Sequence, residues 1–193
     1  MNKRVFIVHG WDGFPEENWF PWLKSELEAK GFLVFVPQLP AADEPRINTW
    51  VPALAESVGV VDEQTYFVGH SMGCQTIVRF LESLDGDAKV GGAVFVAGFL
   101  KSLSNLEDEE QVRSVADEWL KTPLNLAKVK SHLTKSVAIF SDNDPFIPLE
   151  NQEEFRDVLH SKIIVEHGKG HFNKESGVLE IQSALSALLE ISE

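Results

Sequence analysis

The sequence Gly69-His70-Ser71-Met72-Gly73 has the spacing of a serine nucleophile held at a sharp turn between a strand and a helix. Residues 65–68 predict a buried strand before it, and the pattern over about 73–84 is helical. Such a turn strains its central residue and lifts the hydroxyl clear of the sheet. Side chains two residues before and two residues after it would collide with the turn, and glycine at both places avoids this. The helix N-terminus favours a developing oxyanion. We therefore predict that Ser71 is a nucleophile and that the Met72 N–H stabilises the oxyanion.

A serine hydroxyl needs a neighbouring imidazole to take its proton, and that imidazole needs a carboxylate to orient it. His171 lies in a glycine-bracketed loop at 168–173, after a late strand and before the last predicted helix, and it is the favoured base. His167, nearer the strand end, is the alternative. His70 adjoins the nucleophile, and we predict a structural role for it because a side chain at that place in the turn points elsewhere.

The carboxylate is expected in the loop after the strand predicted at 136–140, where Asp142 and Asp144 compete. We favour Asp144 because Pro145 and Pro148 stiffen the chain that follows it, whereas Asp142 is better placed to form a local turn. The chain order serine, aspartate, histidine is the order that this kind of site uses.

The loop after the first predicted strand contains His9-Gly10-Trp11-Asp12-Gly13, and its glycines allow the backbone to approach a reacting carbonyl closely. We predict that the Trp11 N–H is the second oxyanion donor. Aromatic residues on or near the expected catalytic loops predict an apolar substrate pocket, formed by Trp11, Phe14, Trp19, Phe99, Phe146 and Phe172.

Short β-branched runs alternate along the chain with segments of helical periodicity, which predicts an α/β fold in three layers around a mostly parallel, six-stranded sheet. The whole chain, 1–193, is expected to be one domain. The predicted strands are 5–8, 32–36, 65–68, 92–97, 136–140 and 163–165. The predicted helices are 22–30, 49–58, 73–84, 149–159 and 178–191. An acidic, polar segment runs from about 102 to 135, and its part from 102 to 130 is either a small partial cap or a peripheral helix.

Composition excludes several other classes of protein. Thirty acidic and seventeen basic residues give a net charge of -13, which disfavours binding to nucleic acid or to an anionic membrane. The single cysteine, Cys74, excludes an internal disulfide and a multi-thiolate zinc site, and it fits a cytoplasmic location. No apolar run is long enough for an export signal or a membrane span. Two glycine-rich motifs are typical of nucleotide-binding domains, G-x-G-x-x-G and G-x-x-x-x-G-K-S/T, and neither follows a predicted strand in this sequence.

The chain resembles the small serine hydrolases of the α/β-hydrolase superfamily that are similar to retinoblastoma-binding protein nine and the bacterial YdeN-like proteins. The resemblance covers nearly the whole chain and rests on residues 7–11, 18–23, 69–74, 142–148 and 170–172. It implies a minimal hydrolase core with little or no cap, and a Ser71-Asp144-His171 triad in which Asp144 rather than Asp142 is the acid. It also implies that no metal or organic cofactor takes part.

We therefore expect a serine hydrolase that cleaves a small-molecule carboxylic ester or small amide through an acyl-enzyme. The alternative is a non-catalytic or weakly catalytic protein that keeps the fold to bind a partner. An intact triad argues against that alternative. The sequence leaves the physiological substrate and any protein partner open.

Overall fold

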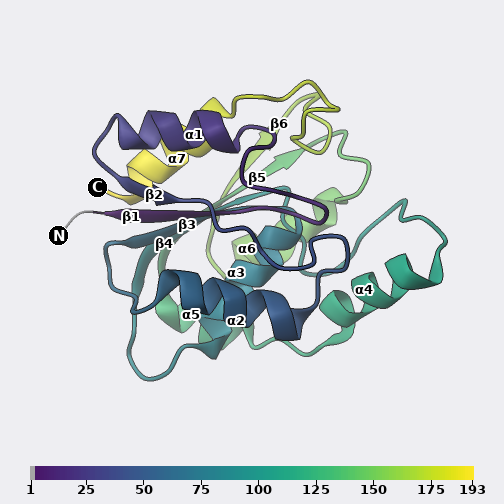
Figure 1. Ribbon diagram of the computed structural model, residues 1–193, viewed down its shortest axis with the longest axis horizontal. Helices are drawn as coiled ribbons and strands as arrows, with labels where there is room; N and C mark the ends of the chain where they lie inside the picture. Colours follow the sequence, from purple (N-terminus) through teal and green to yellow (C-terminus); the bar gives the residue numbers. More distant parts are fainter. Residues whose placement is uncertain (1–2) are drawn as a thin grey trace.

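The computed structural model describes residues 3–193, and a six-stranded sheet forms its middle layer (Figure 1). All five strand pairings are parallel, in the order β2-β1-β3-β4-β5-β6. The strands are β1 (Arg4–Val8), β2 (Leu33–Phe35), β3 (Thr65–His70), β4 (Val90–Val96), β5 (Leu133–Ser141) and β6 (Lys162–Glu166). Every residue of β3 and β4 is buried, because both faces of the sheet are covered. The predicted six-stranded sheet is confirmed.

Helices cover the two faces of this sheet. On one face lie α1 (Phe20–Glu28) and α7 (Gln182–Ile191), and on the other lie α2 (Ile47–Val58), α3 (Met72–Ser83) and α5 (Leu126–His132) (Figure 1). A 3-10 turn, η1 (Leu149–Asn151), leads into the short helix α6 (Gln152–Asp157). The three-layer α/β architecture follows from apolar stripes of helices packing on a sheet that is apolar on both sides.

All five predicted helices differ from the observed ones in at least one bound, and the largest shift is at the start of the last helix. The last was expected from Val178 but begins at Gln182, because Gly177 has a positive φ of 75° and the amide of Val178 donates to Asn173 O in a turn. Val178 is nevertheless buried, so its place in the apolar pattern reflects packing of a loop. The first helix begins at Phe20, two residues earlier than predicted, with a proline in its first turn.

The polar segment between β4 and β5 contains α4 (Glu110–Lys121) in addition to α5. Trp119 of α4 is buried, its ring lies 6.1 Å from that of Trp50 on α2, and Glu118 pairs with Arg46. These contacts dock α4 beside α2, near the carboxyl ends of the strands (Figure 1). The segment is therefore a flanking element and no separate cap domain.

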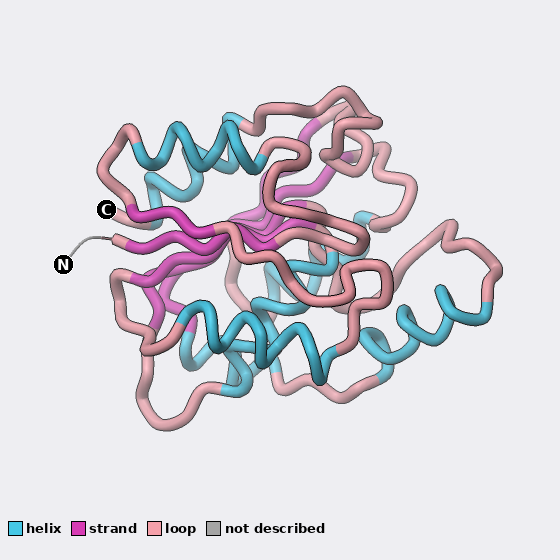
Figure 2. The backbone as a smooth tube through the Cα atoms, viewed as in Figure 1, coloured by secondary structure: helices cyan, strands magenta, loops and turns pink. Residues whose placement is uncertain are grey.

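The loops that follow the strands gather at the carboxyl edge of the sheet (Figure 2). In open parallel sheets this edge is where sites are built, because loops from several strands meet there. Within residues 3–193, none of the helices combines the length and the apolar character that a membrane crossing requires.

Candidate active site

Ser71 occupies the turn between β3 and α3 with φ 52° and ψ −117°, a left-handed conformation that a serine adopts at an energetic cost. Its amide donates to Val96 O at the end of β4, 3.0 Å away, and its carbonyl accepts from the Cys74 amide. These two hydrogen bonds hold the strained residue from both sides. The predicted strand, turn and helix are all present, and the turn directs Ser71 to the carboxyl edge of the sheet.

The two glycines of the motif are required by close contacts. A Cβ atom on Gly69 would lie 2.9 Å from the Cα atom of Cys74, and one on Gly73 would lie 2.2 Å from Val8 O. Both distances are shorter than van der Waals contact between such atoms. The first turn of α3 thus packs directly against the end of β1, and any larger residue at either position would displace the turn.

Asp144 and His171 meet in the structure. The Nδ1 atom of His171 lies 2.9 Å from Oδ2 of Asp144, and the two side chains are only 12% and 1% exposed. Asp144 Oδ1 also accepts hydrogen bonds from the amides of Phe146 and Ile147. A carboxylate only accepts, so the proton lies on Nδ1 of the neutral imidazole and Nε2 is free to take a proton.

The alternative residues form a second pair. His167 Nδ1 lies 2.6 Å from Oδ2 of Asp142, with the imidazole 88% and the carboxylate 39% exposed. This hydrogen bond, together with one from the Gly168 amide, lowers the pKa of Asp142. Neither His167 nor Asp142 borders the cavity that contains Ser71.

Trp11 and Met72 border the same cavity as Ser71. Met72 is the first residue of α3, so its amide precedes the first hydrogen bond within the helix and is free to bind a ligand. The amides of Asp12 and Gly13 donate to Ala42 O and Gly10 O, whereas in residues 3–193 the Trp11 amide has no partner. Two backbone donors therefore remain available beside the serine.

A buried histidine that the sequence argument did not use holds the Trp11 loop. His9 Nδ1 donates to Gly10 O at 2.8 Å, and Nε2 accepts from the Leu39 amide at 3.0 Å. Burial lowers the pKa of His9, so the ring is neutral and can play both roles. Only the folded chain brings Leu39 beside this loop, so the sequence carried no signal for this role.

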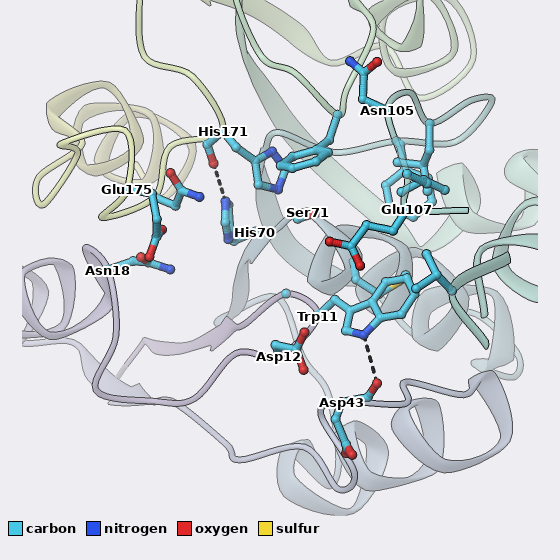
Figure 3. A pocket seen from close by; sticks show the side chains of 18 of the residues that line it. Trp11, Asp12, Asn18, Asp43, His70, Ser71, Asn105, Glu107, His171 and Glu175 are labelled. Atoms are coloured by element: carbon cyan, nitrogen blue, oxygen red, sulfur yellow. Dashed lines mark hydrogen bonds between the residues drawn. The ribbon is translucent and has the colours of Figure 1, made fainter. Parts of the chain in front are cut away.

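The cavity has a volume of about 670 Å³ and lies at the carboxyl edge of the sheet. Ser71, His171 and Trp11 face it from three different loops (Figure 3). The segment 103–112, before and at the start of α4, forms a further wall of the cavity. The sequence favoured neither a partial cap nor a peripheral helix for this region. Asn151 anchors the base of that wall, because its Oδ1 accepts from the amides of Leu100 and Lys101.

Of the aromatic residues predicted to bind substrate, Trp11, Phe99 and Phe146 line the cavity. The other three do not, and the prediction was wrong for them. Trp19 and Phe172 are buried in the core, where the indole N–H of Trp19 donates to Phe172 O. Phe14 is 48% exposed and lies outside the cavity lining. Proximity in sequence to a catalytic loop does not decide which way a side chain points.

Among residues 3–193, the cavity is lined by six carboxylate side chains and by no lysine or arginine. The six are Asp12, Glu17, Asp43, Glu107, Glu109 and Glu175. Burial raises the pKa of Glu17 to about 7, and repulsion from Glu175 and Asp12 adds to this effect. The cavity therefore combines aromatic surface with a negative potential that would repel anionic ligands.

Comparisons with known proteins show the family to which this chain belongs. A sequence model of the family described as "Serine hydrolase" matches residues 5–190. YdeN of Bacillus subtilis (strain 168), which is named as a hydrolase, is 32% identical over 178 residues, covering 92% of this chain and 90% of YdeN. The serine hydrolase RBBP9 of Rattus norvegicus is 27% identical over 155 residues, covering 80% of this chain and 77% of RBBP9.

Solved structures give the same result for the fold. The crystal structure of the ydeN gene product from B. subtilis superposes with a TM-score of 0.89 at 28% identity, covering 98% of both chains. A carboxylesterase structure from Nitrososphaera gargenis superposes with a TM-score of 0.73 at 13% identity, covering 99% of this chain and 91% of that one. The expected α/β-hydrolase fold is confirmed.

Proposed function

Because the chain belongs to the serine hydrolase family, we propose that it cleaves a carboxylic ester or a small amide through a covalent acyl-enzyme on Ser71. His171 is the general base and acid, Asp144 orients it, and the Trp11 and Met72 amides bind the oxyanion. The observation that carries this proposal is that Ser71 and His171 border one cavity, and that His171 is paired behind it with the buried carboxylate of Asp144.

In the first half of the reaction, Ser71 Oγ attacks the carbonyl carbon while His171 Nε2 takes the hydroxyl proton. The carbonyl oxygen becomes an oxyanion between the two free amides. When the bond to the leaving group breaks, the imidazolium gives its proton to the departing alcohol or amine. In the second half, water attacks the acyl carbon with His171 again as base, and the acid product leaves Ser71 free.

The size and the walls of the cavity favour a small substrate. A volume of about 670 Å³ is in the range of pockets that bind drug-sized molecules. Phe99 and Phe146 offer apolar surface for an acyl group, and Phe146 also contacts the His171 ring edge-on at 5.2 Å. An extended polymer would have to pass the 103–112 wall, so we propose a small-molecule ester or amide.

The decisive experiment is labelling with a fluorophosphonate, which reacts with activated serine hydroxyls. We expect the wild-type chain to be labelled and Ser71→Ala to be unlabelled. Ser57→Ala is the matched control, because Ser57 is exposed on α2 and far from the cavity lining. A wild-type chain that is folded but not labelled would contradict the proposal and favour the non-catalytic alternative.

A panel of substrates then separates the two bond types. Short and long acyl esters of p-nitrophenol test esterase activity, and aminoacyl amides with a fluorescent leaving group test amidase activity. We expect hydrolysis of the short acyl esters with loss of activity in Ser71→Ala. Turnover of the amides alone would redefine the substrate without changing the nucleophile.

A further inference from the structure

The imidazole of His70, next to the nucleophile, has no part in the mechanism proposed above, yet it contacts the base. The side chain lies in the interior, with the residue only 4% exposed, and its Nε2 lies 2.8 Å from the backbone carbonyl oxygen of His171. The two imidazole rings are 5.0 Å apart, and Figure 3 shows His70 directly beneath the His171 backbone. The two residues are 101 positions apart in the sequence.

The hydrogen bond determines which nitrogen of His70 carries the proton. A carbonyl oxygen only accepts, so Nε2 must be the N–H donor. Burial, and to a lesser extent the positive charge that His171 carries when protonated, lowers the pKa of His70 to about 3, so the His70 ring is neutral at physiological pH. Its Nδ1 is then a bare acceptor, and within residues 3–193 it has no partner.

A buried acceptor without a partner destabilises a fold, and a phenylalanine of similar size would avoid that effect. Packing alone therefore does not account for an imidazole at this position. What His70 supplies beyond a phenylalanine is the hydrogen bond to His171 O.

The backbone around His171 needs such an anchor. Gly170 and Phe172 both have a φ of 52°, so the loop is irregular on each side of the base. The amide of His171 makes only a long hydrogen bond, 3.3 Å, to Ser176 Oγ. The next carbonyl, that of Phe172, is held by the Trp19 indole, so the chain through the base is held mainly by side chains.

We propose that His70 is a positioning residue that ties the backbone of His171 to the strand and turn carrying Ser71. Because His70 and Ser71 are adjacent, the hydrogen bond fixes the position of the base, His171, relative to the nucleophile, Ser71. A neutral His70 also places no positive charge beside the imidazolium that forms during the reaction. This inference rests on the proposed function of Ser71 and His171.

Three variants test the role of the hydrogen bond. His70→Phe keeps a ring but removes the donor. His70→Gln places an amide N–H near the position of Nε2, and His70→Asn carries the same group on a chain too short to reach His171 O. We expect His70→Phe and His70→Asn to lower kcat about 10- to 100-fold with little change in KM, because the base is misplaced while the aromatic walls formed by Phe99 and Phe146 are unchanged.

His70→Gln is expected to recover most of the wild-type kcat. Thermal unfolding and circular dichroism verify that each variant is folded. If His70→Phe does not fold, the comparison of kcat between His70→Gln and His70→Asn tests the proposal. The proposal is overturned if folded His70→Phe or His70→Asn keeps the wild-type kcat, or if Gln loses as much as Asn.

Fluorophosphonate labelling separates this inference from the proposed function. If the wild-type chain shows labelling that depends on Ser71 while all three His70 variants react at the wild-type rate, only the positioning role fails. If the wild-type chain shows no such labelling, both proposals fail together.

Discussion

Two aspartate–histidine pairs join the loop after β5 to the loop after β6, and they differ in burial. Asp144 and His171 are nearly covered, and His171 borders the cavity with Ser71, whereas Asp142 and His167 lie on the surface outside it. The donor and acceptor types and the hydrogen-bond lengths are similar in the two pairs. Whether such a pair can act on a substrate in this fold therefore depends on where the pair lies and what surrounds it.

The surroundings change both the strength and the direction of the interaction. Water screens the exposed pair, and such pairs contribute little to stability. The buried pair is shielded from water, and two backbone amides hold the Asp144 carboxylate toward His171. Asp142 instead binds the Gly168 amide and closes its own loop onto that of His167. The exposed pair thus serves as an internal control for the buried one.

The largest expected difference between the pairs is in the histidines. His171→Gln should lower kcat/KM by about 10⁶-fold, since the serine then has no base. His167→Gln should leave kcat/KM within about twofold of wild type, because its ring is exposed and outside the cavity. Steady-state kinetics on the best ester of the panel measures both. Equal losses in the two variants would show that burial does not distinguish the pairs.

The aspartates should show the same contrast at a lower level. Asp144→Asn should reduce kcat by about 10⁴-fold, because an amide can donate to Nδ1 and leave the proton on Nε2, the wrong tautomer for a base. Asp142→Asn should retain nearly all activity. Measuring kcat at saturating ester concentration, with thermal unfolding as the folding control, tests this. A large loss in Asp142→Asn alone would assign the acid role to the other pair.

The charge of the cavity should affect substrate choice more weakly. An ester with a carboxylate on its acyl chain should have a KM about tenfold above that of a neutral ester of the same size, since six carboxylates line the cavity. The ratio of the two KM values should shrink as salt is added. Glu107→Gln should also lower it, whereas Asp142→Asn, outside the cavity, should not. A KM ratio that changes neither with added salt nor in Glu107→Gln would contradict an electrostatic cause.

The smallest effect concerns the half-buried carboxyl of Glu17, which has no cationic partner in the described part of the chain. Burial raises the pKa of Glu17 to about 7 from an ordinary value of 4.5, so the fold favours its protonated form. Its contribution to stability is fully present below about pH 4.5 and is lost as the pH rises through 7. The Tm of the wild-type chain relative to Glu17→Gln should therefore fall between pH 5 and 8. A Tm difference that stays constant over this range would contradict the shift.

Much of the fold followed from local sequence. The continuous apolar strands and the glycines around Ser71 predicted a parallel sheet and a turn into a helix, because burial on both faces and a crowded turn restrict the residue types that fit. The bounds of the last helix were wrong because a loop can bury Val178 as well as a helix can. Hydrophobic periodicity reports burial and does not report backbone hydrogen bonds.

In the candidate site, too, some features followed from local sequence and others did not. The sequence by itself determined the residue types and the order of Ser71, the two aspartates and the two histidines, because the turn and the loops after strands have local signatures. Only the tertiary structure decided which aspartate meets which histidine, and that Trp19 and Phe172 point into the core. It also brought His70 to the backbone of His171, 101 residues away. Such choices depend on the direction of side chains across loops, which no spacing along the chain encodes.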